Sequence, residues 1–142
     1  MKILFLVAVS VVLAGWAWVR FAPDDPARWH RGSGRTETGP QSGKNSHVYR
    51  ERPDDAARRL AAFDAVIRAT PRTTHLAGSL EERRITYVTR TRLVGYPDYT
   101  TLSLEETPEG PVIELFGRAR YGRSDLGVNR GRIEAWIQAL RQ

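Results

Sequence analysis

Apolar residues recur along this chain in three patterns, and each pattern predicts a different kind of element. Residues 3–19 are uncharged and almost wholly apolar, which predicts one long helix. Residues 56–67 and 133–140 carry apolar side chains at helical spacing, which predicts two amphipathic helices. The apolar stripes consist of Ala56, Leu60, Phe63 and Ile67 in the first of these helices and Ile133, Trp136, Ile137 and Leu140 in the second.

Short runs that alternate apolar and polar residues lie between the two amphipathic helices. Four such runs, at residues 73–80, 84–92, 99–106 and 112–121, are separated by turns, two of them rich in Gly and Pro, and residues 46–50 are a candidate fifth strand. Short links between successive strands favour antiparallel neighbours. The sequence therefore predicts an α+β domain, in which an antiparallel four- to five-stranded meander is covered on one face by two helices.

The last of these runs also predicts which face of the sheet the helices cover. The positions that share its apolar face are Ile113, Leu115, Gly117, Ala119 and Tyr121. Successive side chains of a strand point to opposite faces, so Arg118 and Arg120 are expected on the uncovered face. Trp136 follows the stripe of the last helix and is expected in the core.

The first helix is predicted to anchor the chain in a membrane. Residues 3–19 would span about 26 Å as a helix, close to the thickness of a bilayer core. Trp16, Trp18 and Phe21 end the run with aromatic residues of the kind that lie at membrane interfaces, which favours a retained anchor. A cleaved signal peptide is the alternative, since small residues near the end of the run would suit a cleavage site.

The expected location is the cytoplasmic (inner) membrane, crossed once, with the domain on the outer, periplasmic face. Lys2 and the short N-terminal tail favour this orientation, whereas Arg20, Arg28, Arg31 and Arg35 favour the reverse. Residues 23–46 are rich in Pro, Gly, Ser and charge without periodicity, which is typical of a flexible tether. The chain thus divides into an anchor at 1–22, a tether at 23–46 and a domain at 47–142.

Charge is distributed unevenly along the chain. Residues 23–116 carry 14 basic and 14 acidic side chains, whereas residues 117–142 carry 6 arginines against 2 carboxylates. A local excess of this kind creates a field that attracts anions. The absence of cysteine excludes disulfides and thiol chemistry. His30, His47 and His75 have no metal-ligand spacing, and we expect neither a metal site nor a cofactor.

The basic segment contains a distinctive motif. Its residues are Arg118, Arg120, Gly122, Ser124, Asp125, Leu126, Gly127, Asn129, Arg130, Arg132 and Ile133. This pattern resembles the C-terminal signature of the domain of unknown function family 1499, and the segment from Gly95 to Asp98 is similar to a second motif of that family. Ala119 and Tyr96 depart from its usual Ser and Phe. The resemblance covers roughly residues 48–140 and implies a small envelope or organelle-lumen domain without an established activity.

The same segment is the candidate binding site. Helix N-terminal amides together with arginine side chains commonly bind phosphate, sulfate or carboxylate. The candidate anion-binding residues are Arg118, Arg120, Arg123, Arg130 and Arg132, and the residues expected to cap the helix or shape the site are Ser124, Asp125, Asn129, Gly122 and Gly127. A local network in which Asp125 and Glu134 neutralise some of these arginines is the alternative.

These observations lead to hypotheses from different classes. The first is a membrane-anchored, non-catalytic module that binds an anionic group, such as a lipid headgroup or an acidic envelope polymer. The alternative is an enzyme acting on a phosphate- or carboxylate-bearing substrate through Asp125, Asn129 and Arg130, with Asp98 as acid or base. Nucleic acid is a weaker third candidate, because no aromatic-interleaved strand accompanies the charge.

Overall fold

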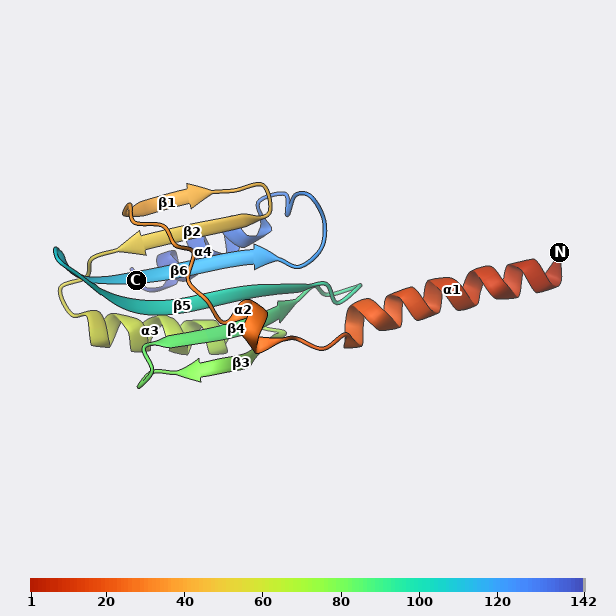
Figure 1. The fold of residues 1–142 in the computed structure, drawn as a ribbon, viewed down its shortest axis with the longest axis horizontal. Coiled ribbons are helices and arrows are strands. Elements are labelled where there is room, and N and C mark those ends of the chain that lie inside the picture. The colour runs from red at the N-terminus through yellow and green to blue at the C-terminus, as the bar shows by residue number, and fades with distance from the viewer. Residues whose placement is uncertain (142) are drawn as a thin grey trace.

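Six antiparallel strands form one sheet, with two helices on one face and a long N-terminal helix projecting from one end (Figure 1). The computed structural model describes residues 1–141. The strands are β1 (Gly39–Ser42), β2 (Ser46–Glu51), β3 (Thr73–Ser79), β4 (Arg84–Arg90), β5 (Pro97–Thr107) and β6 (Gly110–Ala119). They lie in the order β1-β2-β6-β5-β4-β3.

This arrangement confirms the α+β class and adds one strand to the predicted number. β3 to β6 form the expected meander, and β2 is the candidate fifth strand, paired with β6 from Ser46 opposite Arg118 to Glu51 opposite Ile113. β1 was not predicted, because its four residues contain no alternation of apolar and polar side chains. It extends the sheet beyond β2 from within the segment that was expected to be a tether.

The two predicted amphipathic helices cover the same face of the sheet. α3 (Ala56–Arg68) begins at Asp55, whose carboxylate accepts a hydrogen bond from the Arg58 amide at 3.0 Å. α4 (Val128–Ala139) contributes Trp136, which is buried and donates from its indole nitrogen to Thr70 at 2.8 Å. The buried core between sheet and helices consists of Leu60, Phe63, Ile67, Ile85, Tyr87, Leu102, Ile113, Leu115, Ile133, Trp136 and Ile137.

Gly117 determines how closely α4 approaches β6. A Cβ atom at this position would lie 2.8 Å from Asn129 Oδ1 and 3.2 Å from Ile133 Cδ1. Any side chain larger than hydrogen would push the helix away from the strand. The glycine therefore allows Asn129 to be fully buried against the sheet.

α1 (Lys2–Phe21) is 20 residues long, with a mean hydropathy of 2.1 over its most apolar window. None of its residues is buried by the rest of the protein. At 1.5 Å per residue it is about 30 Å long, so its length and composition suit a membrane span.

The segment that follows α1 differs from the predicted flexible tether, because it packs along the uncovered face of the sheet. We call residues 22–35 the N-terminal strap. Within it, the short helix α2 (Pro26–Trp29) places the Trp29 ring on that of Tyr99, with centroids 3.9 Å apart and planes 8° apart. Further along, the Ser33 amide and hydroxyl both donate to the Glu114 carboxylate, at 2.7 and 2.6 Å.

Candidate functional site

The five arginines of the candidate binding site are divided between the two faces of the sheet. Arg118 and Arg120 lie on the face covered by the strap, as the alternation of β6 predicts. Arg118 is 5% exposed and donates to Thr101 Oγ1 at 3.0 Å and to the backbone carbonyl of Trp29. Burial lowers its pKa to about 10, and the nearby Arg31 acts in the same direction. Arg118 is therefore a structural residue beneath the strap.

Arg120 is also occupied by the strap. Its guanidinium donates to the Pro23 carbonyl at 3.0 Å and to the Tyr99 hydroxyl at 3.2 Å, and it lies 3.5 Å from the Asp24 carboxylate. Asp24 also accepts from Arg90 at 2.8 Å. This cluster joins the strap to β4, to β5 and to the start of the loop that follows β6. Sequence reasoning missed Asp24, because an isolated carboxylate in a polar segment gives no periodic signal.

The other three arginines differ in their partners. Arg130 is exposed and pairs with Glu134 at 2.7 Å, one helical turn away. Arg132 is half-buried and pairs with Asp98 at 3.0 Å. Arg123 is exposed, and no carboxylate among residues 1–141 lies within 4 Å of its guanidinium. Of the five, only Arg123 thus remains available to an external anion without breaking a pair in the described part of the chain.

The Asp125 carboxylate accepts hydrogen bonds from backbone amides at the N-terminus of α4. One carboxylate oxygen accepts from the Gly127 amide at 3.1 Å, and the other accepts from the amide and side chain of Asn129 at 3.0 and 2.9 Å. Although partial burial acts to raise it, these hydrogen bonds hold the pKa of Asp125 below its ordinary value. The chain's own carboxylate therefore sits where an external anion was expected to bind.

A continuous polar network connects Asp125 to Asp98. Arg132 donates to Asn129 Oδ1 at 3.2 Å and to Asp98 Oδ2 at 3.0 Å, and Asn129 donates to Asp125. Burial raises the pKa of Asp98, and the Arg132 guanidinium opposes that shift. Residues of both quoted motifs, far apart in sequence, thus meet in one structure that fixes α4 to β5. We call it the Asp98–Asp125 network.

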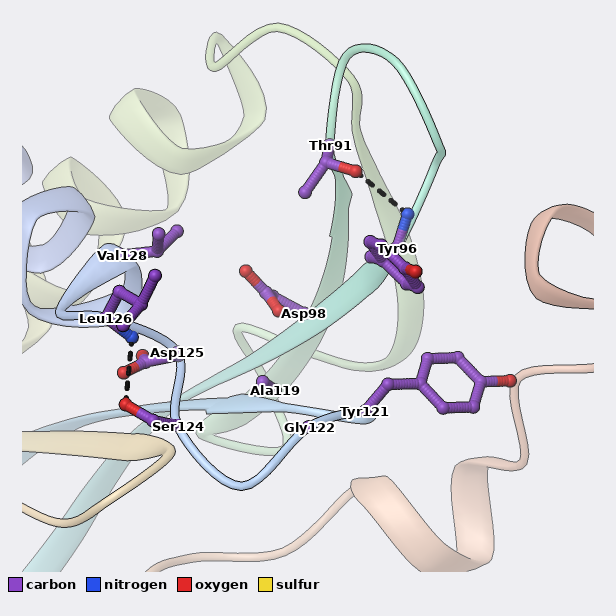
Figure 2. Close-up of a pocket in the computed structure, with 10 residues that line it drawn as sticks. All are labelled: Thr91, Tyr96, Asp98, Ala119, Tyr121, Gly122, Ser124, Asp125, Leu126 and Val128. Atoms are coloured by element: carbon purple, nitrogen blue, oxygen red, sulfur yellow. Dashed lines mark hydrogen bonds between the residues drawn. The ribbon is translucent and has the colours of Figure 1, made fainter. Parts of the chain in front are cut away.

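A pocket of about 420 Å³ lies beside this network (Figure 2). Residues of the loops 91–96 and 120–127 line it together with the ends of β5, β6 and α4. Asp98 lies in the middle of the ring of lining side chains, whereas the Tyr121 ring points away from it (Figure 2). The full lining consists of Thr91, Tyr96, Asp98, Ala119, Tyr121, Gly122, Ser124, Asp125, Leu126 and Val128.

Both loops that line the pocket lie at the end of the sheet from which α1 projects (Figure 1). We call residues 91–96 and 120–127 the α1-proximal loops. Arg90 donates to the Val19 carbonyl at 3.4 Å and to the Gly95 carbonyl at 3.1 Å, and the Arg20 guanidinium lies beside Gly95. The C-terminal end of α1 therefore contacts the first of these loops directly.

Large apolar side chains are exposed at this end of the domain. Leu93 and Leu126 are 86% and 91% exposed, and Tyr96 and Val128 are about half exposed. Arg92 and Lys44 are exposed nearby, and within residues 1–141 neither pairs with a carboxylate. The sequence held a signal for this surface, namely single leucines within polar, glycine-containing loops, but it could not show that the loops converge.

The chemistry open to this site is limited by its hydrogen bonds. Asp125 is committed to helix amides, while Asp98 has one oxygen paired with Arg132. Ser124 accepts from the Leu126 amide at 3.2 Å and has no histidine beside it in the pocket lining. Within the described residues, no group of three or more His, Asp or Glu side chains is arranged to hold a metal ion.

The comparisons with known proteins agree with the motif. No curated protein matches the chain. The family model described as "Protein of unknown function (DUF1499)" matches residues 22–140. The match begins before residue 48, where the resemblance was expected to start, and so includes the strap and β1 as well as the sheet and the two covering helices. The chain therefore belongs to the DUF1499 family.

Proposed function

We infer that the protein is a single-pass envelope protein whose domain lies against the bilayer and binds anionic lipid headgroups through its α1-proximal loops, without catalysing a reaction. The observation that carries this proposal is the exposure of Leu93 and Leu126 at the end of the domain that meets the C-terminal end of the apolar helix α1. The proposed site is the inner membrane, with the domain on its periplasmic side.

The first support is the short connection between α1 and the sheet. Asp24 lies three residues after the end of α1 and bonds to Arg90, Tyr99 and Arg120. With α1 in a bilayer, these contacts leave the loop of residues 91–96 level with the last turn of the helix, and the loop of residues 120–127 lies at the same end of the sheet (Figure 1). That level corresponds to the headgroup region, because Trp16, Trp18 and Phe21 mark the interface on α1.

The second support is the combination of side chains on the α1-proximal loops and on the neighbouring turn between β1 and β2, which carries Lys44. Exposed apolar residues beside uncompensated cations are typical of surfaces that enter a membrane interface and attract anionic lipids. Leu93 and Leu126 supply the apolar part. Arg92, Arg123 and Lys44 supply the charge, each worth about 1 kcal/mol near an anionic surface. Of the five arginines predicted from the sequence to bind an anion, this proposal retains only Arg123.

The absence of cysteine from the sequence allows a direct test. Leu126→Cys carries a nitroxide label on the second loop, and Arg58→Cys carries the same label on exposed α3 as the matched control. The full-length protein is reconstituted into vesicles of zwitterionic lipid with and without anionic lipid. We expect the Leu126 label to collide with lipid-soluble oxygen rather than with a water-soluble relaxant, and the Arg58 label to show the opposite preference.

Charge reversal tests the anionic part of the proposal. Arg92→Glu/Arg123→Glu should move the Leu126 label towards water in anionic vesicles, with little change in zwitterionic ones, and high salt should have the same effect. Arg58→Glu is the control. Equal accessibility of both labels to water in every vesicle would exclude the proposal. Labelling of the same cysteines in intact cells with an impermeant maleimide tests the periplasmic orientation.

A second candidate function is supported by one specific observation. Asp98 and Asp125 line one pocket, and their environments shift their pKa values in opposite directions, an arrangement used for acid–base catalysis. An enzyme of this kind would turn over model phosphate or carboxylate esters, and Asp98→Asn would abolish turnover. Unchanged hydrolysis in Asp98→Asn, or no turnover of either ester, would leave the non-catalytic module.

A further inference from the structure

The pocket beside Asp98 has a composition different from that of the surface around it. Its floor holds a carboxylate that is 5% exposed, and its rim carries the exposed side chains of Leu126, Tyr96 and Val128. Its volume of about 420 Å³ lies within the range of small-molecule sites. Such sites commonly combine apolar walls with a few polar groups that orient the ligand.

Asp98 has hydrogen-bonding capacity left over. Arg132 donates to Oδ2, whereas no donor among residues 1–141 bonds to Oδ1. Asp125, the other carboxylate of the lining, accepts three hydrogen bonds from its own loop and helix. The pocket therefore presents one carboxylate oxygen without a donor in the described part of the chain, which suits a ligand group that donates a hydrogen bond.

We propose that this pocket binds a membrane amphiphile whose polar end is a hydrogen-bond donor, a hydroxyl or a protonated amine, with that end on Asp98 and the hydrocarbon chain leaving past Leu126 and Tyr96 into the bilayer. The proposal rests on the proposed function only in that the α1-proximal loops bring the mouth of the pocket to the lipid. Amphiphiles with a carboxylate end should bind this pocket more weakly, because their carboxylate would face that of Asp98.

Three water-soluble probes of equal chain length separate the polar groups: hexylamine, 1-hexanol and hexanoate. Each is titrated into the full-length, isotope-labelled protein in maltoside micelles, and the amide resonances are followed by NMR. We expect saturable shifts of the Gly122 and Gly127 amides with the amine and the alcohol. Hexanoate should bind at least about tenfold more weakly. Equal shifts with all three probes, or shifts that do not saturate, would overturn the proposal.

Two variants identify the pocket as the place of binding. Ala119→Phe fills the cavity and keeps the Asp98–Arg132 pair. It should lower the affinity for hexylamine and for 1-hexanol at least about tenfold. Asp98→Asn keeps the volume and removes the charge, and it should lower the affinity for hexylamine more than that for hexanol. Hexylamine binding that survives both changes would refute the assignment.

The same variants distinguish failure of this inference from failure of the proposed function. Ala119→Phe leaves Leu126, Arg92 and Arg123 in place, so the depth of the Leu126 label in vesicles should not change. If the Leu126 label is exposed to water while hexylamine still shifts the Gly122 and Gly127 amides saturably, the proposal that the loops face the membrane is refuted and the ligand-binding pocket is supported. If the Leu126 label is in lipid but hexylamine causes no saturable shifts, only the proposal of ligand binding in the pocket is refuted.

Discussion

The two faces of the sheet are covered by segments of different kinds. The face under α3 and α4 is an apolar core. The face under the N-terminal strap buries charged and hydroxyl groups, among them Arg50, Glu114, Arg118, Thr86 and Thr101. A helix covers a sheet by burying an apolar stripe, whereas the strap covers it by forming hydrogen bonds and one aromatic stack. The comparison shows that one thin sheet holds both a hydrophobic and an electrostatic interface.

The largest loss of folding stability is expected from a substitution on the helix-covered face. Phe63→Ala removes a fully buried ring of α3 and should lower the free energy of unfolding by about 4 kcal/mol, since phenylalanine truncations in a core leave a cavity. Urea unfolding of the protein in micelles, followed by circular dichroism, measures this loss. Arg58→Ala on the exposed side of the same helix should change stability by less than about 0.5 kcal/mol.

The next largest effect concerns the buried ion pair on the strap-covered face. Glu114→Ala leaves the buried Arg50 paired only with Glu105, whose carboxylate is partly exposed, and should cost about 3 kcal/mol, the lower end of the range for breaking a buried pair. The double variant Arg50→Leu/Glu114→Leu should lose less than Glu114→Ala, because it removes both charges together. The same urea titration compares them. A double variant less stable than the single one would show that this face depends on the charges themselves.

A smaller, local effect is expected for the strap. Trp29→Ala removes the stack on Tyr99 and should weaken docking of the strap by about 2 kcal/mol, without unfolding the core. Opening should then be about thirtyfold more frequent, and trypsin should cleave after Arg28 or Arg31 correspondingly faster. Trp16→Ala on exposed α1 is the matched control. Unchanged cleavage in Trp29→Ala would show that the rest of the strap suffices to hold it.

The smallest effect is a pH dependence. Burial lowers the pKa of His47, a buried residue of β2 that lies between Ser42 of β1 and Gly117 of β6 in the sheet and bonds to Ser42 at 2.9 Å. The unfolded chain therefore binds the proton more readily, so stability is full above pH 6.5 and falls as the pH drops below it. Burial also lowers the pKa of His30. His47→Gln should reduce the difference between urea midpoints at pH 7.5 and 5.5, and an unchanged difference would assign it to other groups.

The helix-covered face could be predicted from the sequence because it is periodic. The spacing of Leu60, Phe63 and Ile67 and the alternation around Ile113 and Leu115 locate α3 and β6, and all five residues are in the core. Arg118 and Arg120 also lie on the predicted opposite face.

The strap could not be predicted, because its contacts leave no period in the sequence. The carbonyl groups of Trp29 and Pro23 accept from Arg118 of β6 and from Arg120 directly after it, and the backbone amide of Ser33 donates to Glu114. Backbone groups are the same at every residue, so composition alone suggested a tether. The pairing of Arg132 with Asp98 could not be predicted either. The two residues are distant in sequence, and only the packing of α4 against the sheet brings them together.

Asp24 has a mechanical consequence, because it joins strands on both sides of β5 within three residues of α1. A swivel at this junction would require three side-chain contacts to break at once. Any tilt or rotation of α1 would instead turn the whole sheet with it, so the helix and the domain would move as one stiff body.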